Sequence, residues 1–325
     1  MPRLPGEDLH ERERREPEGR ERTSRRAPIG RRDVYPGPLV DGRPAGGALA
    51  RLRARIGTLL VSAGERDEAE LERLLVDLPG VTRPNVVSIV SPKGGVGKTT
   101  VTFLVGDLLA SRLKLRAVAV DANPDFGTLA ALAPDARRNP RSLLELMAAR
   151  ERVATAAELT SFVTRLRSGL HLLAAPADAE LMASAGPELY GELLALLGQF
   201  YELVLLDLGT GVTAPLARFA IGRSDQLVVV TTPEWITSAT VLDSLEHLAH
   251  ERTTVVLNQA RRGAADLGAI ESGFRRERVG SAVTIPYDER LRTMLDAGAY
   301  ALEALERSTR LPIRRLGRAV GERLV

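Results

Sequence analysis

The chain has 325 residues, of which 44% are hydrophobic and 27% are charged, and its net charge is +3. A chain of this length and hydrophobicity can bury one large core, which excludes disorder throughout, and so small a net charge gives no general affinity for nucleic acid. The absence of cysteine excludes disulfides, thiol nucleophiles and metal clusters held by cysteine.

The N-terminal segment 1–46 consists mainly of arginine, glutamate, proline and glycine. Because it has few large apolar side chains, it cannot offset its ordering entropy, and we expect a disordered tail. Ten arginines stand against eight acidic residues in 1–33, which favours a solvated tail over a nucleic-acid arm. The start of the chain is unlike a secretion signal, and no apolar run approaches the ~20 residues of a membrane-spanning helix, so a cytoplasmic protein is expected.

Residues 47–83 carry leucines at helical spacing, which predicts two short helices that form a linker or extension. Prolines and a glycine between 78 and 84 then interrupt the helical pattern. The main domain is therefore expected to span residues 84–325.

Beyond residue 84, short β-branched runs alternate with longer helical patterns, as in a parallel sheet with crossover helices. The sequence predicts an α/β fold, a doubly wound, mostly parallel sheet of seven or eight strands with helices on both faces. Seven strands are expected at 85–90, 116–122, 170–175, 202–208, 226–232, 253–259 and 281–287. Helices are expected at about 98–112, 141–149, 157–167, 188–199, 236–250 and 264–276, and from Asp288 to the end.

A glycine-rich loop, Ser91 to Gly97, follows the first expected strand and leads into an amphipathic helix. Only three of the 45 Lys and Arg residues are lysines, and two of them, Lys93 and Lys98, lie here, whereas the third is Lys114. In a chain where arginine is the usual cation, two lysines this close together predict a site that needs a compact ammonium group.

This loop has the composition of a phosphate-binding site. Gly94, Gly95 and Gly97 allow backbone conformations that turn successive N–H groups toward one anion, and the helix N-terminus adds partial positive charge. Lys98 is expected to reach the β- and γ-phosphates, and the Thr99 hydroxyl to ligate Mg²⁺. The expected nucleotide-binding residues of the loop are Gly94, Gly95, Val96, Gly97, Lys98, Thr99 and Thr100.

The loop departs from the common pattern G-x-x-x-x-G-K-[ST], because Pro92 stands where the first glycine is required. It matches the variant K-G-G-x-G-K-T-T, and with it the chain from about residue 84 onward resembles the ParA/MinD family of deviant Walker-A ATPases. The resemblance implies that Lys93 reaches the phosphates of ATP held by a partner subunit. It therefore implies a homodimer that forms on ATP binding, with ATP and Mg²⁺ as cofactors and ATP hydrolysis as the reaction.

The strand at 116–122 resembles the family's switch I motif, a hydrophobic strand followed by D-x-D-P. Asp121 matches the first aspartate, but the second, which the family uses to position the attacking water, falls on Asn123. An amide is not an anionic acceptor for that water. Either Asp125 takes over this role and hydrolysis is weak or stimulated by a partner, or hydrolysis is very slow and ATP binding alone is the switch.

The strand at 202–208 resembles the family's Walker B and switch II motifs. Asp207 at its tip is implied to hold Mg²⁺ through water, and the backbone N–H of Gly211 to sense the γ-phosphate. Together with Thr99 and Asp121, Asp207 completes the implied magnesium site. A strand-end aspartate that only caps the next helix is the structural alternative.

Two further strand ends resemble the adenine-contacting positions of the family. These are Asn258 after one strand and Pro286 with Asp288 after another. A strand-end asparagine and a helix-starting Pro-Tyr-Asp are the structural alternatives, and both remain open. The chain has no N-K-x-D motif, so guanine selection is not supported.

The absence of cysteine excludes relatives that carry iron–sulfur clusters or reactive thiols, and the scattered tyrosines argue against tyrosine autokinases. What remains is an ATPase that positions or recruits a larger cargo, in chromosome or plasmid partition, in septum, flagellum or pilus placement, or in secretion. A protein partner would stimulate its turnover. The alternatives are an adaptor that Asn123 keeps from hydrolysing ATP, and a small-molecule ligase or kinase that shares the loop.

Two basic segments are candidates for a surface that binds DNA or a membrane. Residues 306–325 carry six arginines against two glutamates, with an apolar stripe. We expect a last helix that starts at Pro312 and packs on the sheet, with a membrane-surface helix as the alternative. The arginines at 261, 262, 275, 276 and 278 are either a solvated face or a non-specific DNA contact. Such surfaces would place the protein on the nucleoid or the inner membrane face.

Overall fold

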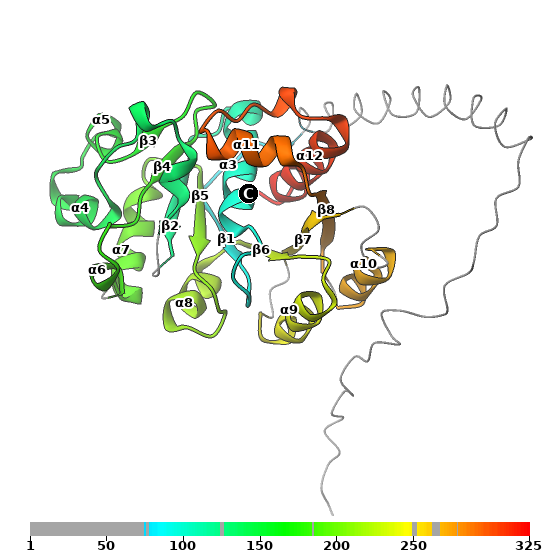
Figure 1. Ribbon diagram of the computed structural model, residues 1–325. Helices are drawn as coiled ribbons and strands as arrows, with labels where there is room; N and C mark the ends of the chain where they lie inside the picture. Colours follow the sequence, from blue (N-terminus) through cyan, green and yellow to red (C-terminus); the bar gives the residue numbers. More distant parts are fainter. Residues whose placement is uncertain are drawn as a thin grey trace, which may run out of the picture.

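The computed structural model in Figure 1 describes Leu75 and residues 78–325, except 124–126, 184, 249–251, 262–266 and 278. In this part of the chain, eight strands form one sheet in the order β3-β4-β2-β5-β1-β6-β7-β8. Neighbouring strands are parallel, apart from the antiparallel pair β3 and β4. The strands are β1 (Asn85–Val90), β2 (Ala117–Ala122), β3 (Thr164–Arg165), β4 (His171–Leu173), β5 (Leu203–Leu208), β6 (Gln226–Thr231), β7 (Thr253–Ala260) and β8 (Ser281–Pro286).

Helices cover both faces of the sheet, which confirms the doubly wound α/β prediction (Figure 1). Helices α3, α11 and α12 pack on one face, and α4 to α10 pack on the other. Their bounds are α3 (Lys98–Leu113), α4 (Leu143–Ala148), α5 (Ala156–Thr160), α6 (Ala179–Ala183), α7 (Pro187–Leu197), α8 (Pro215–Arg223), α9 (Trp235–Leu248), α10 (Leu267–Arg276), α11 (Glu289–Asp296) and α12 (Arg307–Gly321).

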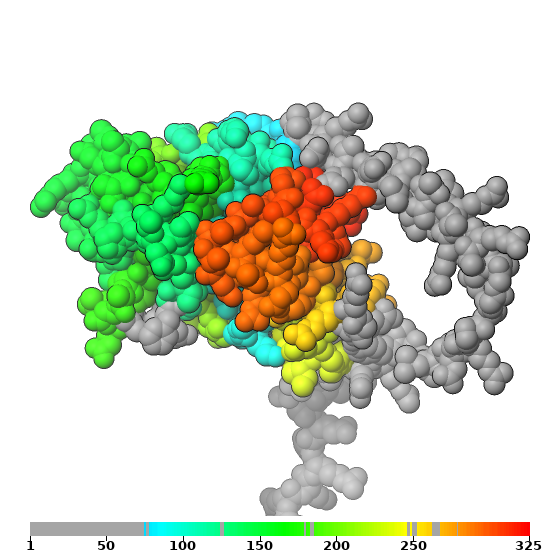
Figure 2. All heavy atoms as spheres, turned by 45° about the horizontal axis from the view of Figure 1, so that its top comes forward, coloured from blue at the N-terminus to red at the C-terminus, as the bar shows by residue number. Residues whose placement is uncertain are grey.

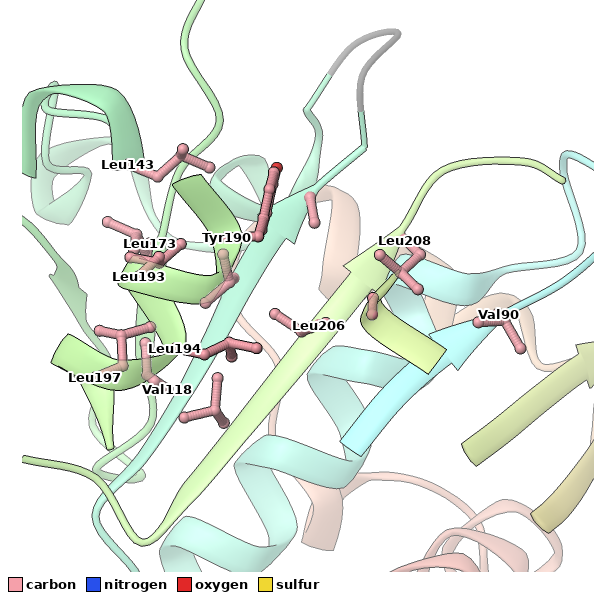
Figure 3. Packing of buried hydrophobic residues seen from close by; sticks show 14 of the residues in the cluster. Val90, Val118, Leu143, Leu173, Tyr190, Leu193, Leu194, Leu197, Leu206 and Leu208 are labelled. Atoms are coloured by element: carbon pink, nitrogen blue, oxygen red, sulfur yellow. The ribbon is translucent and has the colours of Figure 1, made fainter. Parts of the chain in front are cut away.

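Alternate side chains of the central strands fill the two halves of the core. In β2, Val118 and Val120 belong to the half covered by α7, whereas Ala117 and Ala119 belong to the half covered by α3. Figure 3 shows α7 packed over β2 and β5, with its leucines and Tyr190 turned toward the strands. Because a one-residue slip would exchange the two faces, the register is fixed, and the carboxyl ends of the strands meet at a defined edge.

The short helices and the edge strand β3 are where the sequence prediction was wrong or incomplete. The helix expected at 157–167 ends at Thr160, and Thr164–Arg165 instead forms β3. A capping box between Thr155 and Glu158 starts this helix, but only one turn follows before the chain extends along β4. Helices α6 and α8, like β3, are absent from the expected elements, because each is too short for a clear period.

The C-terminal segment is helical but interrupted, so the continuous helix expected from Asp288 is wrong. Helix α11 ends at Asp296, a 3₁₀ turn η4 (Leu302–Ala304) follows, and α12 begins at Arg307. The chain turns between them at Gly298, whose φ of +60° is left-handed. A Cβ there would lie 2.7 Å from the backbone nitrogen of Pro134, so both conformation and space require glycine.

Helix α12 packs its apolar stripe against the sheet, as predicted for the last helix. Leu316 and Val320 are fully buried. Pro312 lies inside the helix and not at its start, which corrects the expected boundary. The first turn is held by Thr309, whose hydroxyl donates to Asp288 Oδ2 at 2.6 Å, so the helix begins before the proline.

The tail expected at 1–46 and most of the extension at 47–83 lie outside the described residues. Leu75 and Leu78 pack against the half of the core that α3 covers. None of the described helices combines the length and the hydrophobicity that crossing a bilayer requires.

We expect Gly298→Ala to lower the free energy of unfolding by at least about 2 kcal/mol, because it adds backbone strain and a clash with Pro134. Urea unfolding followed by circular dichroism measures this loss. Gly222→Ala in α8 is the matched control, since nothing lies within 4 Å of a Cβ at that position. It should be neutral or stabilise by up to about 1 kcal/mol, and equal losses in both variants would contradict the steric argument.

Candidate functional site

The glycine-rich loop lies between β1 and α3, at the carboxyl edge of the sheet. Its backbone is left-handed at Gly95, with φ of +76°, and at Gly97, with φ of +91°. Val96 between them is 2% exposed and anchors the loop in the core. Helix α3 begins directly after the loop at Lys98. Such a loop, followed at once by a helix N-terminus, has the geometry of an anion-binding site.

Two side chains from the end of β7 hold this loop in place. Asn258 Nδ2 donates to the Val96 carbonyl at 2.9 Å, and Gln259 Nε2 donates to the Gly95 carbonyl at 3.3 Å. A Cβ on Gly97 would collide with Asn258 Nδ2, so the close approach also depends on glycine. The described structure thus gives Asn258 a role in bracing the loop, and its contact with adenine stays a prediction.

Asp121 and Asp207 lie side by side at the carboxyl ends of β2 and β5. They are partners in the parallel register of the two strands, and each is 1% exposed. Asp121 accepts hydrogen bonds from the backbone N–H groups of Leu129 at 2.9 Å and Asn123 at 3.3 Å. Burial raises the pKa of Asp121, and these backbone hydrogen bonds oppose the rise.

Asp207 is the less satisfied of the two carboxylates. Burial raises the pKa of Asp207 to about 7, with a hydrogen bond from Thr99 opposing the rise and the charge of Asp121 adding to it. Thr102 Oγ1 donates to Oδ1 at 3.4 Å, whereas Oδ2 is buried and has no hydrogen-bond partner among the described residues. A buried carboxylate oxygen without a donor, next to a threonine hydroxyl, fits a hard cation such as Mg²⁺.

The segment after β5 also contacts the phosphate loop. The N–H of Gly211 donates to the Ser91 carbonyl at 3.1 Å, and the glycine has a left-handed φ of +96°. Lys98 Nζ donates to Thr210 Oγ1 at 3.5 Å. The structure therefore brings Gly211 to the loop with its N–H bound to the loop backbone, and its contact with a γ-phosphate stays a prediction.

Lys93 is held by the start of α9. Its Nζ donates to Thr237 Oγ1 at 2.7 Å and lies 3.4 Å from Glu234 Oε2. Thr237 and, second to it, Lys93 lower the pKa of Glu234 by hydrogen bonding to its carboxylate. The lysine side chain is 47% exposed, so it is held at the surface and not buried.

A pocket of about 410 Å³ opens beside the loop. Its lining brings together Thr100, Asn258, Pro286 and Asp288, the last three being the expected base-contacting residues. Asp288 also caps α11, because its carboxylate accepts the N–H groups of Arg290 and Leu291. Asp288 therefore has the helix-starting role that was the structural alternative, and its contact with a base stays a prediction.

One expected site residue, Asp125, lies outside the described residues. Several residues of the site were not predicted: Gln259, Thr102, Thr210, Glu234 and Thr237. Their only signal in the sequence is that Thr210, Glu234 and Thr237 follow a strand and Gln259 lies near the end of one, where parallel sheets gather their functional side chains. Thr102 lies one turn after Lys98 on the same helix, and its one hydroxyl hydrogen is shared between the Lys98 carbonyl at 3.0 Å and Asp207 Oδ1 at 3.4 Å.

Residues 87–299 match the family described as the CobQ/CobB/MinD/ParA nucleotide binding domain. A curated relative, the ESX-1 secretion-associated protein EspI of Mycobacterium tuberculosis, is 26% identical over 215 residues, which are 63% of this chain and 32% of EspI. The chain thus matches only about a third of the length of EspI.

Solved structures with the same fold include a ParA family ATPase of Chlorobium tepidum, with a TM-score of 0.62 at 21% identity, covering 72% of this chain and 98% of that one. The cell division ATPase MinD of Pyrococcus furiosus has a TM-score of 0.59 at 22% identity, covering 73% and 98%. Since the family match spans the loop and both aspartate strands, the chain belongs to the CobQ/CobB/MinD/ParA family of nucleotide-binding domains.

Proposed function

We propose that this protein binds Mg-ATP, dimerises when ATP is bound, and hydrolyses ATP slowly in order to position or recruit a larger cargo. The observation that carries the proposal is the buried Oδ2 of Asp207, which has no donor among the described residues and lies at the same edge as the phosphate loop. Burying an unpaired charge is costly, so this oxygen fits a bound cation and its phosphate ligands.

Thr99, Asp121 and Asp207 are the residues that would hold the magnesium, directly or through water. Magnesium supplies charge stabilisation to a transferring phosphoryl group. The loop N–H groups and Lys98 would orient the β- and γ-phosphates, and hydrolysis would then depend on positioning and on stabilisation of developing charge. No covalent step on the protein is needed.

The position of Lys93 is the reason for proposing a dimer that forms on ATP binding. Its side chain is about half exposed, and among the described residues its ammonium group is bound to Thr237 and Glu234 at the start of α9. Exposed ion pairs of this kind are weak, so the lysine can leave them at little cost. A lysine that is released from α9 can reach across to the ATP of a partner subunit.

A non-hydrolysing adaptor is the second candidate, and Asn123 is the observation that favours it. Its backbone N–H donates to Asp121 at 3.3 Å, so residue 123 sits at the magnesium end of the site. An amide there leaves the attacking water without the anionic acceptor it needs, unless Asp125 supplies one.

The proposed cargo belongs to chromosome or plasmid partition, to septum, flagellum or pilus placement, or to secretion. Similarity to the ESX-1 secretion-associated protein EspI supports secretion among these processes. Of the arginines expected to bind DNA, Arg262 and Arg278 lie outside the described residues, Arg275 pairs with Glu271 at 3.7 Å, and Arg261 lies 4.7 Å from the ring of Tyr287. Within the described residues, Arg275 is thus the one arginine of this group that is paired with a carboxylate, whereas Arg261 keeps its charge over the ring and Arg276 is exposed. A location in the cytoplasm, on the nucleoid or at the inner membrane face is part of the proposal.

We predict that Asn258→Ala weakens binding of ATP and GTP by a similar factor, about tenfold, because it removes the brace on the Val96 carbonyl. Calorimetric titration with both nucleotides and with inorganic triphosphate measures this. Thr254→Ala is the control, because Thr254 also lies in β7 but its hydroxyl is hydrogen-bonded to Ser281 and not to the loop. This variant should bind the nucleotides as wild type does. A loss confined to ATP would instead show that Asn258 recognises adenine.

Lys93→Arg should impair ATP-dependent dimerisation although it keeps the charge, because a guanidinium fork cannot replace a compact ammonium group at a phosphate. Sedimentation with and without Mg-ATP reports the dimer. Lys114→Arg makes the same change elsewhere and should dimerise as wild type. A normal dimer in Lys93→Arg would refute the role of this lysine across the interface.

The rates of phosphate release by Asp125→Ala and Asn123→Asp should distinguish a slow ATPase from a non-hydrolysing adaptor. If Asp125 orients the water, Asp125→Ala loses turnover and Asn123→Asp gains it, since an anionic acceptor is restored at the family's position. The rate of phosphate release by Lys98→Ala gives the background level without hydrolysis. An unchanged rate in Asp125→Ala would show that Asp125 is not the replacement, and wild-type release at the background level would favour the adaptor.

A further inference from the structure

A basic groove of about 700 Å³ follows the edge of the sheet at β3. Its lining includes Arg137, Arg138 and Arg165, and contains no carboxylate side chain. Arg137 ends the 3₁₀ turn η2 (Asp135–Arg137), and Arg165 lies on β3. The groove therefore gathers guanidinium groups from two separate segments of the chain.

The surrounding segment concentrates positive charge. Residues 137–171 contain seven arginines and three glutamates, which gives a net charge of +4 against +3 for the whole chain. Two of the glutamates are engaged locally, since Glu145 and Glu158 form capping boxes with Ser142 and Thr155. The acidic residues of this segment are thus mostly occupied at helix starts and do not neutralise the groove.

Many arginines in the described chain are neutralised by close carboxylates. Arg310 and Arg314 both lie 3.0 Å from Glu303, and in the groove Arg138 lies 2.7 Å from Asp135. Arg137 and Arg165 form no ion pair within the described residues. An unpaired guanidinium group on a groove wall is available for an anionic ligand.

An apolar hollow of about 310 Å³ adjoins the groove. Its apolar lining includes Leu115, Leu159 and Phe200, with Lys114 and Arg116 also on its wall, and it shares Thr160 and His171 with the groove. The two cavities therefore form one continuous surface with an apolar end and a cationic end.

His171 marks the junction and is fixed there. Its Nδ1 is hydrogen-bonded to the Tyr201 hydroxyl at 2.8 Å, and the two rings meet edge to face. Burial lowers the pKa of His171, and the charge of Arg165 lowers it further. Both effects disfavour the charged imidazolium, so the arginines, together with Lys114 at the hollow, supply the positive charge of this surface.

We propose that this edge is a docking surface for a partner protein segment with several carboxylates beside one apolar anchor side chain. The carboxylates would pair with Arg137 and Arg165, and the anchor would enter the hollow. A nucleic-acid duplex is the less suitable ligand, because its backbone offers phosphates but no apolar side group for the hollow. A peptide offers both at adjacent positions.

The proposed docking surface is separate from the nucleotide site. Strand β3 lies four strands away from β1, which at the usual spacing is about 19 Å. Figure 2 shows the green segments that carry the groove at one end of the molecule, and α12, in red, toward the other. The inference therefore does not depend on dimerisation or hydrolysis, and both sites can be occupied together.

Fluorescence anisotropy with a labelled peptide of six glutamates followed by leucine and phenylalanine tests the proposal on the full chain. We expect binding that weakens with salt and that falls about tenfold in the double variant Arg137→Glu, Arg165→Glu. The double variant Arg276→Glu, Arg315→Glu is the matched control, because both arginines are exposed and form no ion pair within the described residues. It has the same net charge and should bind as wild type.

Ala156→Trp provides a second variant that changes no charge. Ala156 is exposed and lines the hollow, so a tryptophan there should block the anchor and weaken binding without unfolding the chain. Peptides that end in two alanines, or that carry glutamine in place of glutamate, should bind about tenfold more weakly. Circular dichroism and urea unfolding measured in parallel confirm that each variant is folded, whether or not it binds ATP.

Three outcomes would overturn the proposal. The first is peptide binding that is absent in wild type or unchanged in the groove variant. The second is equal binding of the peptide that ends in two alanines, which would leave the hollow without a role. The third is tighter binding of a duplex DNA that depends on Arg137 and Arg165, which would make this edge a nucleic-acid surface.

Discussion

The structure depends on burying two carboxylates next to each other. Asp121 and Asp207 are paired in register across β2 and β5, and both are almost inaccessible to water. Such a pair repels itself in a low-dielectric interior, so it persists only where donors and cations compensate it. Backbone N–H groups do this for Asp121, whereas threonine hydroxyls and the charge of Lys98 do so in part for Asp207. The ligand that we propose, Mg²⁺ with its nucleotide, would supply the rest. The phosphate loop next to it is where such a ligand would bring its charge.

The strand order places these groups together. Strand β5 lies between β2 and β1, so the loop that follows β1 stands directly beside the carboxylate that ends β5. Strands β6 and β7 continue the same edge and supply Glu234, Asn258 and Gln259 around the loop. A parallel sheet collects residues that are more than 150 positions apart in sequence at one edge, as the separations of 162 and 164 for the two β7 contacts show.

The sequence was sufficient to predict the central strands, because Val, Ile and Leu runs buried on both faces are typical of parallel strands. It was also sufficient for the loop, since three glycines and two lysines at this spacing are typical of phosphate binding. It was insufficient for β3, which has two residues and gains its strand character only from pairing with β4. It was likewise insufficient for the basic groove. Residues 137 and 165 are 28 positions apart, and whether an arginine is paired depends on neighbours that only the fold brings near.

The contacts from β7 to the phosphate loop have a further consequence. Asn258 and Gln259 bind the carbonyls of Val96 and Gly95, so contacts within the chain help to hold the loop in this shape. The fewer conformations these contacts leave to the loop, the less backbone entropy a bound nucleotide has to offset. The same contacts connect the loop mechanically to the far half of the sheet. A displacement of β7 or β8 would therefore shift the loop and the phosphates that it binds. Neither strand carries a group that is proposed to take part in the reaction.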